Sequence, residues 1–241
     1  MEVPPMVIAA PPEAEKSTFR KQLESAVNAK HSKSSPFSEA WAEGRLTRDH
    51  FAFWVGQHLG YVGHFSEWMG HMFGDCPHKD ARDFLLQNMW EEEMGTPHTE
   101  LLIRFGMACG WSREQLENAE PLVTTRAMRA WCDLLGRSHD FLGATAGLIV
   151  GLESQTPGIY TRQLPPLRET YGFTDEETFF FELHISSDVV HGERGYQIVE
   201  KYADTLEKQA HCLEMVRQAG QMRWMYMDGL YRALVEQVGA V

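Results

Sequence analysis

The sequence predicts an all-α protein, and three observations support this fold class. Apolar residues recur at three- and four-residue spacing along most of the chain, runs of β-branched residues bounded by turns are scarce, and helix-capping signals punctuate the segments. The 241 residues can bury one large core, and we find no repeat, low-complexity tract or linker that divides them. We therefore expect one domain, a bundle of about seven to eight helices over residues 14–241, after a flexible proline-rich lead over residues 1–13.

Helices can be placed in order because start and stop signals interrupt the apolar periodicity. Ser35 and Pro36 are typical of a helix N-terminus, and Thr47 can cap the long helix that follows. Ser112 with Gln115 predicts a capping box for a short helix. The remaining segments with helical periodicity are approximately 47–74, 79–94, 98–109, 122–136, 139–153, 157–171, 175–201 and 205–238.

Charge and cysteine usage exclude several functional classes. The net charge of −12 would repel nucleic acids and anionic membrane surfaces, and the sequence contains no basic patch that would offset it. No run approaches the ~20 apolar residues that span a bilayer, and the N-terminus lacks the layout of a signal peptide. The four cysteines are scattered and form no CxxC pair, which indicates a reducing compartment. We therefore expect a cytoplasmic protein with neither nucleic acid nor a membrane as its partner.

The segment FFFELHISSDVVHGERGY, residues 179–196, places His184, Asp188 and His191 at successive offsets of four and three. An α-helix turns about 100° per residue, so these three side chains share one stripe and converge. The preceding phenylalanines indicate a partly internal helix, where a buried charge needs a partner. Two interpretations stay open, namely a metal site and a salt-bridged stripe on a solvated face.

A further carboxylate, Glu153, ends a run of small and aliphatic residues over 144–152. Such a run favours close packing against neighbouring helices and leaves the carboxylate facing the interior. A lone buried glutamate is costly unless it is protonated, paired or bound to metal. Glu153 is therefore a second candidate metal ligand.

Three consecutive glutamates, residues 91–93, precede His98. Glu91 and His98 are seven residues apart and would share a helical face, whereas Glu92 needs the break at residues 95–97 to rotate His98 inward. At most one of the three is expected to bind metal, because a solvated helix face accounts for the others. The spacing alone leaves the choice between Glu91 and Glu92 open.

These segments together offer three carboxylates and three histidines, a number that suits two metal ions rather than one. Mixed nitrogen and oxygen ligation with open positions is typical of redox iron or manganese in helical bundles. A closed structural zinc site would prefer four ligands, often including thiolates, and the cysteines lie outside this pattern. The donor set therefore favours a redox metal.

The segments NMWEEEMGTPHTELLIRFGMACGWSREQLE, GLESQTPGIY and ELHISSDVVHGERG resemble the three ligand-bearing helices of heme-oxygenase-like diiron oxidases and oxygenases. The superfamily includes the PqqC quinone synthases and the TenA thiaminases. The resemblance implies a heme-oxygenase-like bundle around a pocket, two iron ions (Fe(II)/Fe(III)) and O2 as co-substrate. Glu92 is preferred over Glu91 because the family's glutamate stands four residues after Asn88. The implied ligands are Glu92, His98, Glu153, His184, Asp188 and His191.

The resemblance also bears on substrate and assembly. Related enzymes oxidise small organic molecules such as amino acids, fatty acids and biosynthetic intermediates, and they are often homodimers. A chlamydial member makes para-aminobenzoate from its own tyrosine and lysine side chains. The matching positions here hold Ser38, Leu152 and Gln163, so that self-sacrificing chemistry is not implied for this chain.

Three rival interpretations accompany the diiron hypothesis: a metal-free PqqC-like oxidase of cofactor biosynthesis, a TenA-like thiaminase, and a non-catalytic helical binding protein. The thiaminase would need a nucleophilic thiol, for which Cys132 is the candidate.

Three histidines on the aromatic-rich segment after Thr47, namely His58, His64 and His71, are expected in the core or lining the pocket rather than binding metal.

Overall fold

Helices account for most of residues 17–238, the part of the chain that the computed structural model describes, and these residues contain no strand. The all-α prediction is confirmed. Nine helices of eleven residues or more lie within this described range, close to the predicted number. The predicted lead over residues 1–13 lies outside it.

The bounds of the α-helices are α1 (Thr18–Ala29), α2 (Pro36–Ala42), α3 (Arg48–Val62), α4 (Phe65–Asp75), α5 (Lys79–Glu93), α6 (His98–Ala108), α7 (Arg113–Glu117), α8 (Val123–Gly136), α9 (Phe141–Ala144), α10 (Thr156–Glu169), α11 (Phe179–Tyr202) and α12 (Leu206–Val238). A 3₁₀ turn, η1 (Ser32–Ser34), precedes α2. A π-helical stretch, η2 (Thr145–Leu152), and a 3₁₀ turn, η3 (Glu153–Gln155), connect α9 to α10.

The predicted caps form as hydrogen bonds. The hydroxyl of Ser35 accepts a hydrogen bond from a backbone N–H at the start of α2, and that of Thr47 does the same for α3. Ser112 and Gln115 form a reciprocal capping box at α7. These side chains satisfy backbone donors that have no partner inside a helix, which is why the helices begin there.

The long helix predicted over residues 47–74 is two helices, α3 and α4. Gly63 ends α3 with its N–H on the carbonyl of Leu59, and the backbone of His64 leaves the helical region. A Cβ at position 63 would stand 2.9 Å from the Leu59 carbonyl oxygen, so this tight turn requires glycine. The break redirects α4, whose Phe65 and Trp68 line the internal cavity described below.

The helix predicted over residues 139–153 is also irregular. It starts as α9, widens into the π-helix η2 and tightens into η3 at Glu153. The stretch packs closely against α12, because a Cβ at Gly151 would lie 2.4 Å from the Cβ of Ala219. It packs as closely against α11, where a Cβ at Gly195 would lie 2.5 Å from Ile149. Wide turns of this kind are common at functional sites.

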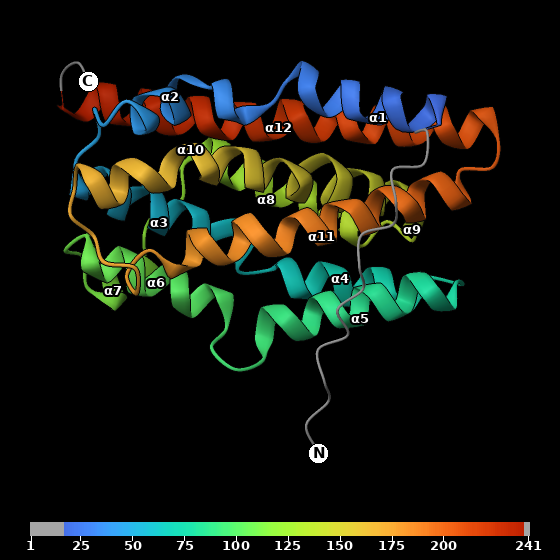
Figure 1. Ribbon diagram of the computed structural model, residues 1–241, viewed down its shortest axis with the longest axis horizontal. Helices are drawn as coiled ribbons and strands as arrows, with labels where there is room; N and C mark the ends of the chain where they lie inside the picture. The colour runs from blue at the N-terminus through green and yellow to red at the C-terminus, as the bar shows by residue number, and fades with distance from the viewer. Residues whose placement is uncertain (1–16, 239–241) are drawn as a thin grey trace.

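The longest helix, α12, runs along the bundle with α1 and α2 beside it, and α11 lies between α10 and α5 (Figure 1). Aromatic rings fill the core between α2, α3, α6 and α11. Trp41 meets Trp54 edge-on with ring centroids 5.0 Å apart, and Trp54 stacks on Phe181 at 5.8 Å. Among the described residues, no helix combines the length and apolar character needed to cross a membrane.

Candidate metal centre

The six residues named from the sequence come together in the interior as two groups. Glu92, His98 and His184 form the first group, and Glu153, Asp188 and His191 form the second. Within each group, the potential ligand atoms lie within 4.8 Å of one another. The donors come from the C-terminal turn of α5, the first residue of α6, the turn η3 and two successive turns of α11.

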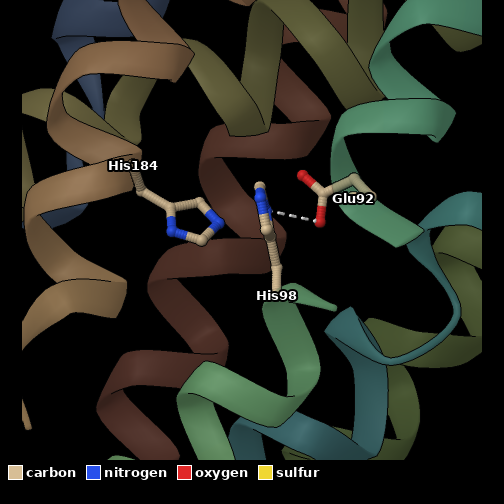
Figure 2. Close-up of side chains that lie close together, drawn as sticks. All are labelled: Glu92, His98 and His184. Atoms are coloured by element: carbon tan, nitrogen blue, oxygen red, sulfur yellow. Dashed lines mark ion pairs between the residues drawn. The ribbon is translucent and has the colours of Figure 1, made fainter. Parts of the chain in front are cut away.

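The first group joins three helices (Figure 2). Glu92 Oε2 lies 2.9 Å from Nδ1 of His98, yet this buried nitrogen forms no hydrogen bond. The rings of His184 and His98 meet edge-on, with centroids 4.7 Å apart and an angle of 70° between their planes. Nδ1 of His184 donates to the carbonyl oxygen of Phe180 at 2.7 Å, which leaves its Nε2 unprotonated in the neutral ring and able to bind a cation.

The second group is built around His191. Its Nδ1 lies 2.8 Å from Oε1 of Glu153 and 3.7 Å from Oδ1 of Asp188. Its Nε2 is 2.7 Å from Oε2 of Glu91, so the imidazole bridges two carboxylates. Asn88 donates to both oxygens of Glu153, at 3.2 and 3.4 Å. Glu91 and Glu92, which the spacing could not separate, thus contact different groups.

Burial and mutual charge perturb the second group. Burial raises the pKa of Glu153 to about 7; the nearby His191 opposes this shift, and the charges of Asp188 and Glu92 add to it. Burial lowers the pKa of His191, but the surrounding carboxylates outweigh burial and raise the pKa to about 12. The hydrogen bond from His191 holds the pKa of Glu91 below its ordinary value. Two buried acids therefore concentrate negative charge around this imidazole.

Both groups line one internal cavity of about 80 Å³. The first group contributes all three of its residues, and the second contributes Glu153 and Asp188. The rest of the wall is mainly aromatic and aliphatic, with a histidine, two threonines and one arginine. These other lining residues are His58, Tyr61, Val62, Phe65, Trp68, Thr99, Leu102, Leu152, Thr156, Tyr160, Phe180 and Arg223.

The three other histidines differ from one another. His58 is buried at the cavity, where its ring nitrogens lie 3.3 Å from the hydroxyl of Tyr226 and 3.4 Å from that of Tyr160. Burial holds the pKa of His58 well below its usual value, so the ring is neutral. His64 is half-buried, 3.1 Å from Glu67, and lies neither in the core nor at this cavity, so the expectation was wrong for it. The expectation was also wrong for His71, which is exposed on α4 because the break at Gly63 rotates that face outward.

Cys132 does not have the environment of a nucleophile. The residue is completely buried in α8, and burial raises the pKa of its thiol, so the thiolate is disfavoured at neutral pH. The other three cysteines are also buried and free. The structure therefore offers no activated thiol for a thiaminase-type reaction among the described residues.

Sequence reasoning missed the buried arginine at the cavity, Arg223 on α12. A signal was present, because Ala219, Tyr226 and Leu230 recur around it at helical spacing and all are buried. An arginine on such a stripe must place its guanidinium inside the protein or extend it to the surface. Here it stays inside.

A helical bundle whose interior holds carboxylates and histidines in neighbouring groups is typical of proteins that bind redox iron. Comparison with known proteins agrees, because residues 52–224 match the model of a family described as iron-containing redox enzymes. The chain belongs to this family and is an oxidoreductase.

Relatives extend over nearly the whole chain. The chain is 30% identical to the 4-aminobenzoate synthase of Nitrosomonas europaea, over 89% of this chain and 92% of the relative. It is 23% identical to the pyrroloquinoline-quinone synthase of Cronobacter sakazakii, over 82% and 80%. A solved structure with a heme oxygenase-like fold, from Shewanella denitrificans, superposes with a TM-score of 0.76 at 16% identity and covers 92% of this chain and 94% of that one. The resemblance inferred from the sequence is confirmed.

Proposed function

We propose that this protein is a non-heme diiron oxidase or oxygenase that uses O2 to oxidise a small organic substrate in the cavity. One observation carries the proposal: two groups of carboxylates and histidines, each compact enough to hold a cation, face the same cavity. We infer an amino acid, a fatty acid or a biosynthetic intermediate as the substrate.

The chemistry of the donors fits iron. Three carboxylates and three imidazoles form a mixed oxygen and nitrogen set that suits Fe(II) and Fe(III). Asp188 and Glu153 are almost fully buried and share a single imidazole, so the two carboxylates carry more negative charge than His191 can offset, and a metal cation would balance it. His98 Nδ1 faces a carboxylate oxygen at 2.9 Å without a hydrogen bond, an arrangement that a shared cation would explain.

One iron would be held by Glu92, His98 and His184, and the other by Glu153, Asp188 and His191. The surroundings of the histidines match this assignment. The carbonyl of Phe180 fixes the tautomer of His184, and Glu91 would accept a hydrogen bond from Nε2–H of His191 when Nδ1 binds the cation. Outer partners of this kind orient metal-binding imidazoles and raise their basicity. Glu91 is thus assigned to support the ligand His191.

Bound iron would supply the electrons and open coordination positions that O2 chemistry requires. The protein would bind the substrate against the aromatic wall and exclude bulk water, because most of the lining residues are buried. We also propose that the protein acts in the reducing cytoplasm, as a homodimer, and that neither nucleic acid nor a membrane is its partner. The net charge of −12 supports the last point.

Metal content tests the proposal. Protein loaded anaerobically with Fe(II) and freed of excess metal should retain about two iron ions per chain. His184→Ala should lose at least one of them, while His71→Ala, which removes an exposed histidine of α4, should keep both. Equal iron in the parent and His184→Ala would refute the assignment. Full O2-dependent activity after complete chelation would favour the metal-free PqqC-like oxidase instead.

A second candidate, formation of 4-aminobenzoate, is favoured by the 30% identity to the Nitrosomonas synthase. It can be tested by mass spectrometry of small molecules released when iron-loaded protein meets O2. Appearance of 4-aminobenzoate without added substrate, together with a matching loss of intact protein mass, would support this candidate. Release of 4-aminobenzoate only when a substrate is added would support an ordinary catalytic oxidase. If no 4-aminobenzoate is released, its formation is excluded under these conditions.

A further inference from the structure

Two arginines are buried in the described part of the chain, and their surroundings differ. The guanidinium of Arg20, on α1, pairs with the carboxylates of Glu24, Glu193 and Glu200. Arg223 is 4% exposed and forms no ion pair with any described residue. A buried cation without an anionic partner is energetically costly, so its retention calls for a specific reason.

The hydrogen bonds that Arg223 makes within the protein use only part of its guanidinium. Nη1 of Arg223 donates to the carbonyl oxygen of Leu152 at 2.6 Å and to the hydroxyl of Thr156 at 3.5 Å. These bonds brace the chain on both sides of the η3 turn that carries Glu153. They use one nitrogen and neutralise no charge. Nε is buried and has no hydrogen-bond partner, and Nη2 donates to no described residue.

The unused edge of the guanidinium matches a carboxylate. Nη2 is free to donate a charge-assisted hydrogen bond to a carboxylate oxygen, whereas Nε is enclosed by protein atoms and would need a small shift of the guanidinium to complete the two-oxygen fork. Arg223 lines the cavity that both metal-binding groups face. The aromatic rings of Tyr61, Trp68 and Phe180 line the same cavity. A small acid could therefore place its carboxylate on Arg223 and its apolar body against these rings.

We propose that Arg223 binds the carboxylate of the substrate, so that the protein acts on a small organic acid with an aromatic or apolar body. This inference rests on the proposed function, because it places the acid in the cavity of the diiron centre. Arg223 orients the substrate and leaves the metal-binding groups to the oxidation. The neutral His58 and the nearby tyrosine hydroxyls supply further uncharged polar contacts.

The test uses the full-length, metal-free protein, because a bound metal could itself bind a carboxylate. Binding of fluoroacetate and 4-fluorobenzoate is followed by fluorine NMR, with fluoroacetamide and 4-fluorobenzamide as neutral counterparts. At least one acid should bind about tenfold or more tightly than its amide, a difference of ~1.4 kcal/mol. Arg223→Gln should abolish this preference, and Arg223→Lys, which keeps the charge, should retain part of it.

Arg217→Gln is the matched control, because it removes an arginine that is 55% exposed on the same helix. It should leave the preference unchanged. If neither acid binds the parent better than its amide, or if folded Arg223→Gln keeps the preference, the inference is wrong. Should Arg223→Gln fail to fold, the acid–amide comparison in the parent and in Arg223→Lys decides. Iron content does not enter this measurement, so its failure is separate from failure of the diiron assignment.

Discussion

Nδ1 of His191 lies 2.8 Å from Oε1 of Glu153, although 38 residues separate the two along the chain. Both side chains are 5% exposed. Glu153 reaches this position from the junction of a π-helical stretch and a 3₁₀ turn, while His191 projects from the regular helix α11. The contact defines the second group of donors, on which the assignment of two metal ions depends.

Glu91→Gln and Glu92→Gln should affect iron binding differently. Glu92 belongs to the first group, so Glu92→Gln should lower iron to about one ion per chain. Glu91 belongs to neither group and contacts His191 through its outer nitrogen, so Glu91→Gln should keep the capacity for two ions while weakening the binding of one of them about 10–100-fold. Anaerobic Fe(II) titration measures both. The reverse pattern would show that Glu91 is the ligand.

Acid should destabilise the protein in part through His31. Burial, followed by the charges of Lys33 and Arg223, lowers the pKa of His31 to about 4. Its Nδ1 also accepts the backbone N–H of Lys33 at 3.2 Å, which requires an unprotonated nitrogen. Between pH ~4 and ~6.5, the unfolded state binds a proton at His31 that the folded state does not. The contribution of His31 to stability is therefore fully present above pH ~6.5 and is lost as the pH falls toward ~4.

His31→Asn preserves an acceptor for Lys33 and removes the titrating group. The free energy of unfolding, measured in urea at pH 7 and pH 4.5, should therefore fall less with acid in His31→Asn than in the parent. Equal slopes for the two proteins would mean that His31 is not responsible.

Gly151→Ala should be costly because the new methyl would lie 2.4 Å from the Cβ of Ala219 on α12. We expect a loss of about 1–3 kcal/mol, as is typical of overpacking. Gly70→Ala is the control, because its methyl would meet only the sulfur of Met89 at 3.8 Å. This change should stabilise the protein by as much as about 1 kcal/mol, because alanine has the higher helix propensity. Thermal unfolding separates them, and a neutral Gly151→Ala would argue against this close approach.

Cys132→Ala should leave O2-dependent activity within about twofold of the parent, because a buried thiol with a raised pKa serves no nucleophilic step. In the native protein, Cys132 should also resist alkylation at neutral pH, and it should react once urea unfolds the chain. Both are measured by peptide mass spectrometry and oxygen uptake. Rapid labelling of the native protein with loss of activity would revive the hydrolase interpretation.

Helical periodicity predicted much of the fold and site because it acts locally. The offsets that join His184, Asp188 and His191 follow from the geometry of a single helix, and α11 has that geometry. Glu153 could be recognised because a carboxylate after an aliphatic run is costly to bury alone. These inferences needed no knowledge of neighbouring helices.

Features that depend on packing between helices were not predictable in this way. The choice between Glu91 and Glu92 depends on how the chain turns between α5 and α6, where Gly95 adopts a φ of 79°. The π-helical stretch depends on close contacts with α11 and α12. The internal position of Arg223 depends on its contact with Leu152, 71 residues away. Periodicity places Arg223 on a buried stripe of α12, but it does not show which distant residue the guanidinium meets.

The most direct test of two metal ions is anomalous X-ray diffraction at the iron absorption edge, from crystals of protein loaded anaerobically with Fe(II). We expect two iron peaks, one among Glu92, His98 and His184 and the other among Glu153, Asp188 and His191. A single peak, or iron bound elsewhere while these groups hold only hydrogen bonds and water, would contradict this expectation.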